Sequence, residues 1–183
     1  MASPSKEGRI LKLILENSPL KEWHFGEIVR GANITRVAAN KWLKKCVKEG
    51  LLKRIKPKGK FPYFTVGNNN LVYYSQKRLY SLEQMHKSGL IPRLLSLQNA
   101  KTIILFGSAI RGDWYKDSDI DIFVFGDASN FDKGQYEATL GRHIELQIFQ
   151  DKHEIQKVKT GLIKNIVNGY VVKGQIQDFV EVA

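Results

Sequence analysis

The sequence predicts an α+β protein with two domains, and both charge and patterning support this division. Residues 1–70 contain 15 basic and 5 acidic residues, whereas residues 96–183 contain 10 basic and 12 acidic residues. The early part has apolar residues at helical spacing, and the later part has short apolar runs typical of strands. A chain of 183 residues is long enough for two small domains. We expect a first domain at 1–70, a helical connector at 71–97 and a second domain at 98–183.

Composition limits the class of protein. The chain has no apolar run near the roughly 18 residues that a membrane-spanning helix needs. Its N-terminal segment MASPSKEGRILKLILENS has charges within the apolar stretch, so we expect no secretory signal. The single cysteine, Cys46, excludes a disulfide within the chain and is expected in a helix core. These features predict a cytoplasmic protein without membrane contact, and the net charge of +11 favours a polyanionic partner.

Three amphipathic helices are predicted in the first domain, from GRILKLILEN, WHFGEIVRGA and NITRVAANKWLKKCVKEG. The first is expected to end before Pro19. For the third helix, Thr35 is the expected N-cap and Gly50 the left-handed residue after its end. Its buried stripe is predicted as Ala39, Leu43, Cys46 and Val47.

A hairpin is predicted next, from LLKRIKPKGKFPYFTVG with its Pro-Lys-Gly-Lys turn. Three helices followed by a basic hairpin resemble a winged helix-turn-helix domain over residues 6–67. In that family the third helix enters the major groove and the hairpin, or wing, contacts the backbone. The resemblance implies nucleic-acid binding, to DNA or RNA, by these residues: Arg36, Asn40, Lys41, Lys44, Lys45, Lys56, Lys58 and Lys60. Winged helices also serve as protein-docking modules, which is the alternative.

The connector begins after three asparagines and has a helical pattern. Its apolar face is predicted as Leu71, Tyr74, Leu79, Leu82 and Met85. A second short helix is expected from Ile91 to Leu97.

The second domain is predicted to hold a small sheet flanked by helices. Its strands are expected in KTIILFGS, DIDIFVFG, RHIELQIFQ and NGYVVKGQ. One helix is expected at 151–168, with this apolar stripe: Ile155, Val158, Leu162, Ile163, Ile166 and Val167.

Two carboxylates interrupt the second of these apolar runs. Because side chains alternate along a strand, Asp119 and Asp121 are expected on one face and Ile120 on the other. Glu145 leaves the core face of the next strand, so it joins the pair if the two strands are neighbours. Three converging carboxylates repel one another, and a hard divalent cation relieves that repulsion. The pattern therefore predicts a Mg²⁺ or Mn²⁺ site formed by Asp119, Asp121 and Glu145.

A glycine turn after the first strand complements these carboxylates. Gly107 allows close approach of a phosphate to the backbone, and the Ser108 hydroxyl can donate to its oxygens. Arg111 lies one turn further and can neutralise phosphate charge. These residue types together favour a ligand with several phosphates, such as a triphosphate.

The full segment GSAIRGDWYKDSDIDIFV resembles the DNA polymerase beta-like nucleotidyltransferase superfamily, and within it the minimal nucleotidyltransferases. The resemblance covers residues 98–174. It implies that Gly107, Ser108, Arg111 and Ser118 bind the nucleotide. It also implies that Asp119, Asp121 and Glu145 bind metal and catalyse, with Glu145 helping to deprotonate the acceptor. The implied reaction transfers a nucleoside monophosphate, with ATP the expected donor, and releases pyrophosphate.

Several alternatives stay open at this point. The acceptor can be a nucleic-acid end, a protein hydroxyl or a small molecule, and a domain of this fold can also have lost its activity. A DNA-binding transcriptional regulator whose second domain senses a nucleotide is one different function. An antitoxin that adenylylates a partner protein is another, and minimal nucleotidyltransferases often have that role.

Overall fold

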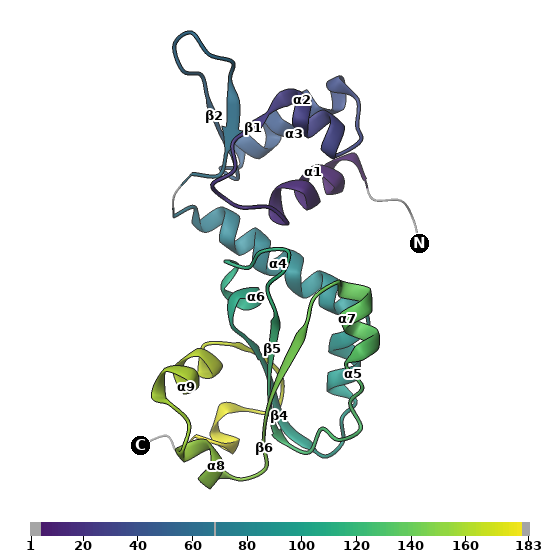
Figure 1. Cartoon of the computed structure of the whole chain (residues 1–183), viewed down its shortest axis with the longest axis vertical. Helices are drawn as coiled ribbons and strands as arrows, with labels where there is room; N and C mark the ends of the chain where they lie inside the picture. The colour runs from purple at the N-terminus through teal and green to yellow at the C-terminus, as the bar shows by residue number, and fades with distance from the viewer. Residues whose placement is uncertain (1–4, 68, 181–183) are drawn as a thin grey trace. The chain divides into compact units, whose positions relative to one another are not determined.

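The structure is a computed structural model, described here for residues 5–67 and 69–180 (Figure 1). The chain divides into two compact units, Met1–Lys77 and Arg78–Ala183. The division falls within helix α4 (Leu71–Lys87), inside the segment 71–97 that the sequence assigns to a connector. Each unit is described by itself.

Unit 1 combines three helices with a small antiparallel sheet. The helices are α1 (Lys6–Leu15), α2 (Phe25–Gly31) and α3 (Arg36–Lys48). The strands are β1 (Trp23–His24), β2 (Lys53–Ile55) and β3 (Tyr63–Thr65), in the order β1-β3-β2. The predicted hairpin is present, since β2 pairs with β3. The prediction of one helix over WHFGEIVRGA is wrong at its start, where Trp23 and His24 pair with β3. A strand of two residues is too short to give an alternating pattern that the sequence could reveal.

Helix α3 follows the sequence pattern closely. The Thr35 hydroxyl caps it by accepting from the Ala38 N–H at 3.3 Å, and Gly50 after its end has φ +76°. Leu43 is buried, as predicted, and burial raises the pKa of the Cys46 thiol to about 11. Val47 does not belong to the buried stripe, because it is 36% exposed.

The predicted apolar face of α4 is only partly correct. Leu71 and Leu79 are exposed, whereas Tyr73, Lys77, Ser81 and Met85 are buried at a spacing of four residues. The Tyr73 hydroxyl donates to the Asn17 carbonyl at 3.2 Å. Hydropathy misses this stripe because two of its members are polar. Helix α5 (Leu90–Leu95) follows a left-handed Gly89.

Unit 2 contains a four-stranded mixed sheet in the order β6-β5-β4-β7. These strands are β4 (Ala100–Phe106), β5 (Ile120–Gly126), β6 (Ile144–Phe149) and β7 (Tyr170–Lys173). β4 is antiparallel to β5 and β7, and β5 is parallel to β6. The predicted small mixed sheet is confirmed.

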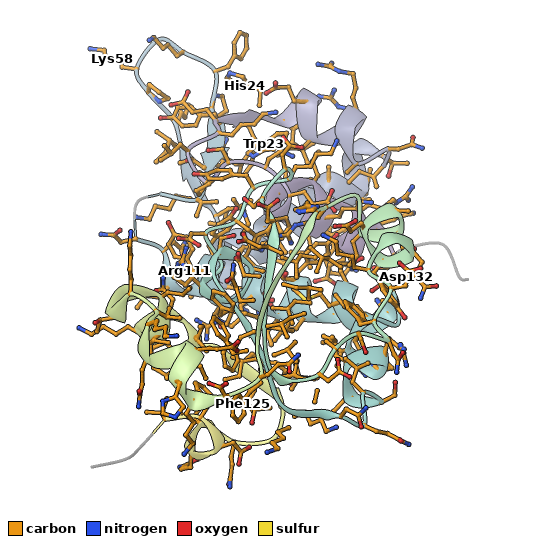
Figure 2. The ribbon with its side chains drawn as sticks, turned by 60° about the horizontal axis from the view of Figure 1, so that its bottom comes forward. Trp23, His24, Lys58, Arg111, Phe125 and Asp132 are labelled. Carbon is orange, nitrogen blue, oxygen red and sulfur yellow. The ribbon has the colours of Figure 1, made fainter. Side chains whose placement is uncertain are left out.

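Helices flank the sheet on both faces, with α5 and α7 (Gly134–Leu140) on one side and α8 (Lys152–Gln156) and α9 (Thr160–Val167) on the other (Figure 1). Side chains alternate between two cores. Ile103, Leu105, Ile122 and Val124 belong to one core, and Ile104, Phe106, Phe123 and Phe125 to the other. Phe125, in the second core, is labelled in Figure 2.

One helical prediction needs correction in this unit, and two helices were not predicted. The single helix expected at 151–168 is two helices, because the chain leaves the helical conformation after Gln156 and Lys159 (ψ 133°) is the non-helical residue before α9. Helix α7 and the short 3₁₀ helix η1 (Ile176–Asp178) have no counterpart in the sequence prediction. Tyr136 is the one residue of α7 that is buried, so the helix has no apolar stripe. Across the described ranges, no helix combines the length and hydropathy needed to span a bilayer.

Candidate active site

The sheet aligns the two carboxylates that the sequence placed on separate strands. β5 and β6 are parallel neighbours, and their register pairs Asp121 with Glu145. Asp119 comes one residue before β5. Ile120 and Ile122 lie in the core on the opposite face from Asp121, as strand alternation requires. The condition set by the sequence pattern, that these two strands are neighbours, is therefore met.

The charges of Asp119 and Glu145 act on the carboxyl group of Asp121. Burial raises the pKa of Asp121, and the charges of Glu145 and Asp119 raise it further. Arg111 and Arg142 oppose this and lower that pKa. Ionised Asp121 thus lies in a partly buried, acidic environment, where a cation would stabilise it.

The side chains are not arranged as a preformed metal cage. No group of three or more His, Cys, Asp and Glu side chains within residues 5–67 and 69–180 is placed to hold an ion. The Glu145 carboxylate accepts from the Gln147 amide at 2.7 Å. The donor set nevertheless consists of carboxylate oxygens, the ligands that Mg²⁺ and Mn²⁺ prefer.

The turn after β4 brings the predicted phosphate-binding segment against Asp121. Phe106, the last residue of β4, pairs with Asp121, and Gly107 follows with φ +71° and ψ −155°. A Cβ at position 107 would lie 1.9 Å from Asp121 Oδ2. Only glycine is compatible with this conformation and this contact. The position of the Asp121 carboxylate therefore depends on a glycine at position 107.

The other predicted nucleotide-binding residues lie around this turn. Ser108 begins the short helix α6 (Ser108–Arg111), and its hydroxyl has no hydrogen-bond partner among the described residues. Arg111, labelled in Figure 2, is exposed and donates to Asp113 at 3.2 Å. The Ser118 hydroxyl accepts from the Tyr115 N–H at 2.8 Å, so it shapes the loop before β5.

Arg142 was missed by sequence reasoning. Its Nε donates to the Ser118 carbonyl at 2.6 Å and its Nη2 to the Asp119 carbonyl at 2.8 Å. The guanidinium lies 4.9 Å from the centre of the Trp114 ring, which stacks on Tyr80. Burial lowers the Arg142 pKa to about 10, against the raising effect of Asp121 and Asp119. No signal in the sequence marks this residue, because its partners lie 24 and 23 positions away.

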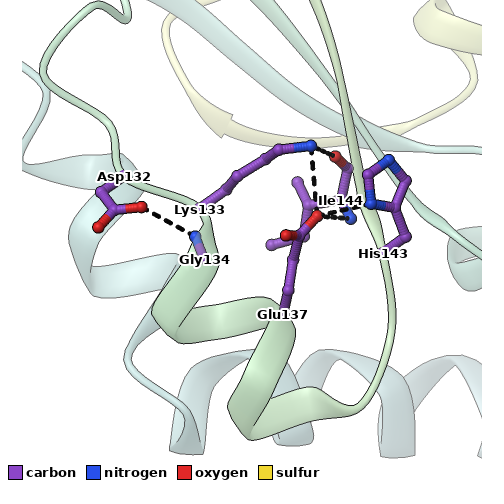
Figure 3. A network of polar contacts seen from close by, with 6 residues as sticks. All are labelled: Asp132, Lys133, Gly134, Glu137, His143 and Ile144. Carbon is purple, nitrogen blue, oxygen red and sulfur yellow. Dashed lines mark hydrogen bonds and ion pairs between the residues drawn. The ribbon is translucent and has the colours of Figure 1, made fainter.

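A second group of contacts fixes the start of β6 (Figure 3). Glu137 on α7 accepts from the Ile144 N–H at 2.8 Å, and Lys133 donates to the Ile144 carbonyl at 2.8 Å. Glu137 also contacts Lys133 at 3.3 Å and His143 at 2.7 Å. The bond from Ile144 is the main cause that lowers the pKa of Glu137. Because Ile144 precedes Glu145, this network positions the backbone of the third carboxylate.

The residues predicted to bind nucleic acid are exposed on unit 1. Arg36 lies over the Phe25 ring at 5.2 Å, and Lys41 lies over the Trp42 ring at 5.0 Å. Lys45 differs from its neighbours, because it is bound to Glu7 at 2.7 Å and to Glu49 at 3.7 Å. The remaining residues are also exposed, and Figure 2 labels Lys58 at the hairpin loop. They are Asn40, Lys44, Lys56, Lys58 and Lys60.

Comparison with known proteins identifies the second half of the chain. The sequence family described as "Nucleotidyltransferase domain" matches residues 87–180. No curated protein and no solved structure matches the chain. The matched range covers just over half of the sequence and contains the glycine turn, all three carboxylates and Arg142. The chain therefore belongs to the nucleotidyltransferase domain family.

Proposed function

We propose that this protein is a metal-dependent nucleotidyltransferase that transfers a nucleoside monophosphate, with AMP from ATP as the first candidate, to an acceptor hydroxyl. Family membership supports nucleotidyl transfer in general. One observation carries the assignment to a site: Asp121 lies against the Gly107 turn and in register with Glu145. This proximity supports a phosphate-binding role for the turn and a metal-binding role for the carboxylates.

Asp119, Asp121 and Glu145 would hold Mg²⁺ or Mn²⁺. Such an ion, when bound, neutralises the carboxylates and stabilises charge that develops on phosphate oxygens. Glu145 is exposed, so its side chain has room to turn from Gln147 toward Asp121.

The remaining roles belong to the chain's own residues. The Ser108 hydroxyl donates to a phosphate oxygen, and Arg111 balances the charge of the triphosphate. Glu145 accepts the proton of the acceptor hydroxyl, whose oxygen bonds to the α-phosphorus as the bond to pyrophosphate breaks. Arg142 fixes the Ser118 and Asp119 carbonyls and so positions the first carboxylate.

We further propose that unit 1 is a winged helix-turn-helix module that binds nucleic acid. The order of its helices and strands supports this, as do the exposed cations on α3 and the hairpin. Lysines in these positions give attraction to phosphates that does not depend on sequence.

The transferase proposal is tested by titrating a non-hydrolysable ATP analogue into the full-length protein with Mg²⁺, followed by transfer assays with α-phosphate-labelled ATP, GTP, CTP and UTP. We expect Asp119→Asn/Asp121→Asn to lose binding and transfer by about 10²–10³-fold or more. Asp127→Asn is the matched control, because the Asp127 carboxylate accepts from the Ser129 N–H and hydroxyl and does not belong to the candidate site. Equal binding by the wild type and the double variant would contradict the proposal, as would no binding of any of the four nucleotides.

A further inference from the structure

A groove separates α3 from the β2–β3 hairpin in unit 1. Its volume is about 490 Å³. This lies within the range of about 300–1,000 Å³ that is usual for pockets that bind small organic groups. Both walls belong to the surface that also carries the exposed cations of α3 and the hairpin.

The floor of this groove is apolar. Leu43 and Phe64 are buried beneath it, and the partly exposed ring of Phe25 contributes to one wall. Val47, which left the predicted core stripe, contributes its exposed side chain. An apolar hollow within a strongly basic surface does not attract polyanions by charge alone, so it needs another explanation.

The rim of the groove consists of polar side chains that are available to bind a ligand. Asn40, Lys44 and Arg54 are exposed and line it. None of these three side chains makes a hydrogen bond or an ion pair within the described part of the chain. Lys45, the next residue on α3, is instead held by Glu7. Two exposed cations without such a partner, Lys44 and Arg54, therefore line the apolar hollow.

This combination matches an unpaired nucleobase attached to phosphates. A base has two apolar faces and a polar edge, and an amide such as that of Asn40 can both donate to and accept from that edge. The flanking phosphates are complementary to Lys44 and Arg54. In a duplex the faces are stacked and the edges paired, so an apolar groove gains little from it.

We infer that the groove between α3 and the hairpin holds an unpaired base of a single-stranded nucleic acid, with neighbouring phosphates bound by Lys44 and Arg54. The inference rests on the proposed nucleic-acid binding by unit 1 and makes it specific for single strands.

The test uses the full-length protein and three fluorescent probes of equal length: an oligodeoxythymidine, its abasic counterpart and a duplex. Anisotropy at fixed salt gives the affinities. We expect the oligodeoxythymidine to bind at least about fivefold more tightly than the abasic strand, the lower limit for stacking of one base. Val47→Phe fills the groove without a change of charge and should reduce oligodeoxythymidine binding to the abasic level.

Val37→Phe is the matched control. It makes the same substitution on the same helix, at a residue that is 82% exposed and outside the groove. We expect it to bind all three probes like the wild type, and thermal melting verifies that both variants are folded.

Each other outcome contradicts either the base-binding groove or the nucleic-acid binding by unit 1. Equal affinity for the abasic and base-bearing strands, or unchanged binding by Val47→Phe, would disprove the groove site and leave nucleic-acid binding intact. If no probe binds, the nucleic-acid function of unit 1 fails as well. If a polyglutamate peptide binds more tightly than the oligonucleotide and Val47→Phe blocks it, the groove belongs to an acidic protein partner instead.

Discussion

The hairpin loop of unit 1 and the turn that precedes β5 in unit 2 both present charged groups, but in different surroundings. Lys56, Lys58 and Lys60 are exposed on the hairpin. In unit 2, Arg142 holds the Ser118 and Asp119 carbonyls of the turn before β5. Asp121, within β5, lies against Gly107 in the turn after β4. Charged side chains that are surrounded by solvent attract a partner but do not fix its orientation. Charged side chains that are held by hydrogen bonds and packing can orient reacting groups. Single substitutions should therefore have small effects in the first region and large effects in the second.

The largest contrast is expected between two glycines. Gly107 and Gly59 both have positive φ, at +71° and +70°, but a Cβ would meet Asp121 at the first and nothing within 4 Å at the second. Gly107→Ala should displace Asp121 and reduce transfer by about 10²-fold or more. Gly59→Ala should cost about 1–2 kcal/mol in the free energy of unfolding and leave transfer unchanged. Transfer rates and urea unfolding of both variants measure this, and normal transfer by Gly107→Ala would refute the described turn.

A second test concerns how the turn before β5 is supported. Arg142→Lys keeps the charge but loses the planar fork that reaches both carbonyls. We expect kcat to fall by about 10- to 100-fold, the usual cost of removing a group that orients a site residue. Arg111→Lys should instead raise KM, because Arg111 is exposed and proposed to meet the nucleotide. A change in KM alone for Arg142→Lys would place this residue in nucleotide binding and not in positioning.

A smaller effect separates two adjacent lysines of α3. Lys44 has no ion pair or hydrogen bond from its side chain within residues 5–67 and 69–180, whereas Lys45 is bound to Glu7 and Glu49. Lys44→Ala should weaken nucleic-acid binding and reduce the slope of affinity against salt concentration by about one. Lys45→Ala should leave that slope unchanged and slightly lower the Tm. Equal loss of slope in both variants would mean that the ion pair opens on binding.

The smallest expected effect is a pH dependence of stability at α7. The Ile144 N–H lowers the pKa of Glu137 below its ordinary value of 4.5. The ionised Glu137 side chain therefore contributes fully to the stability of the fold above about pH 4.5. This contribution is lost as the pH falls through the pKa of Glu137 in the folded protein, which is below 4.5. Glu137→Gln should lower the Tm at neutral pH, and the difference from the wild type should shrink in acid. A difference that is constant with pH would exclude the charge of Glu137 as its cause.

Local rules in the sequence predicted much of the second unit. Alternation along strands placed Asp121 opposite its core neighbours and Glu145 off the core face of its own strand. The parallel direction and the register that pair these two residues were not predicted. Glycine at position 107 was expected to allow close approach of a phosphate, whereas the group that lies close to it in the structure is the Asp121 carboxylate. In unit 1 the cap at Thr35 and the end at Gly50 followed from residue type alone.

Features that depend on distant contacts were not predictable. Arg142 is bound to carbonyls of a loop more than 20 positions earlier, and no local pattern encodes that proximity. Helix α7 lacks an apolar stripe, and Glu137 on it and Lys133 at its N-cap bind the backbone of Ile144. Val47 fits the helical period of the core but lies at its margin, where the groove begins.

The contacts of α7 with Ile144 also bear on self-association. β6 is an edge strand, and an open edge invites another chain to add a strand. Glu137 and Lys133 occupy both backbone groups of Ile144, so an incoming strand would have to displace two charged side chains. The opposite edge, β7, is only four residues long. The sheet thus has one obstructed edge and one short edge, an arrangement that disfavours sheet-to-sheet aggregation at high protein concentration.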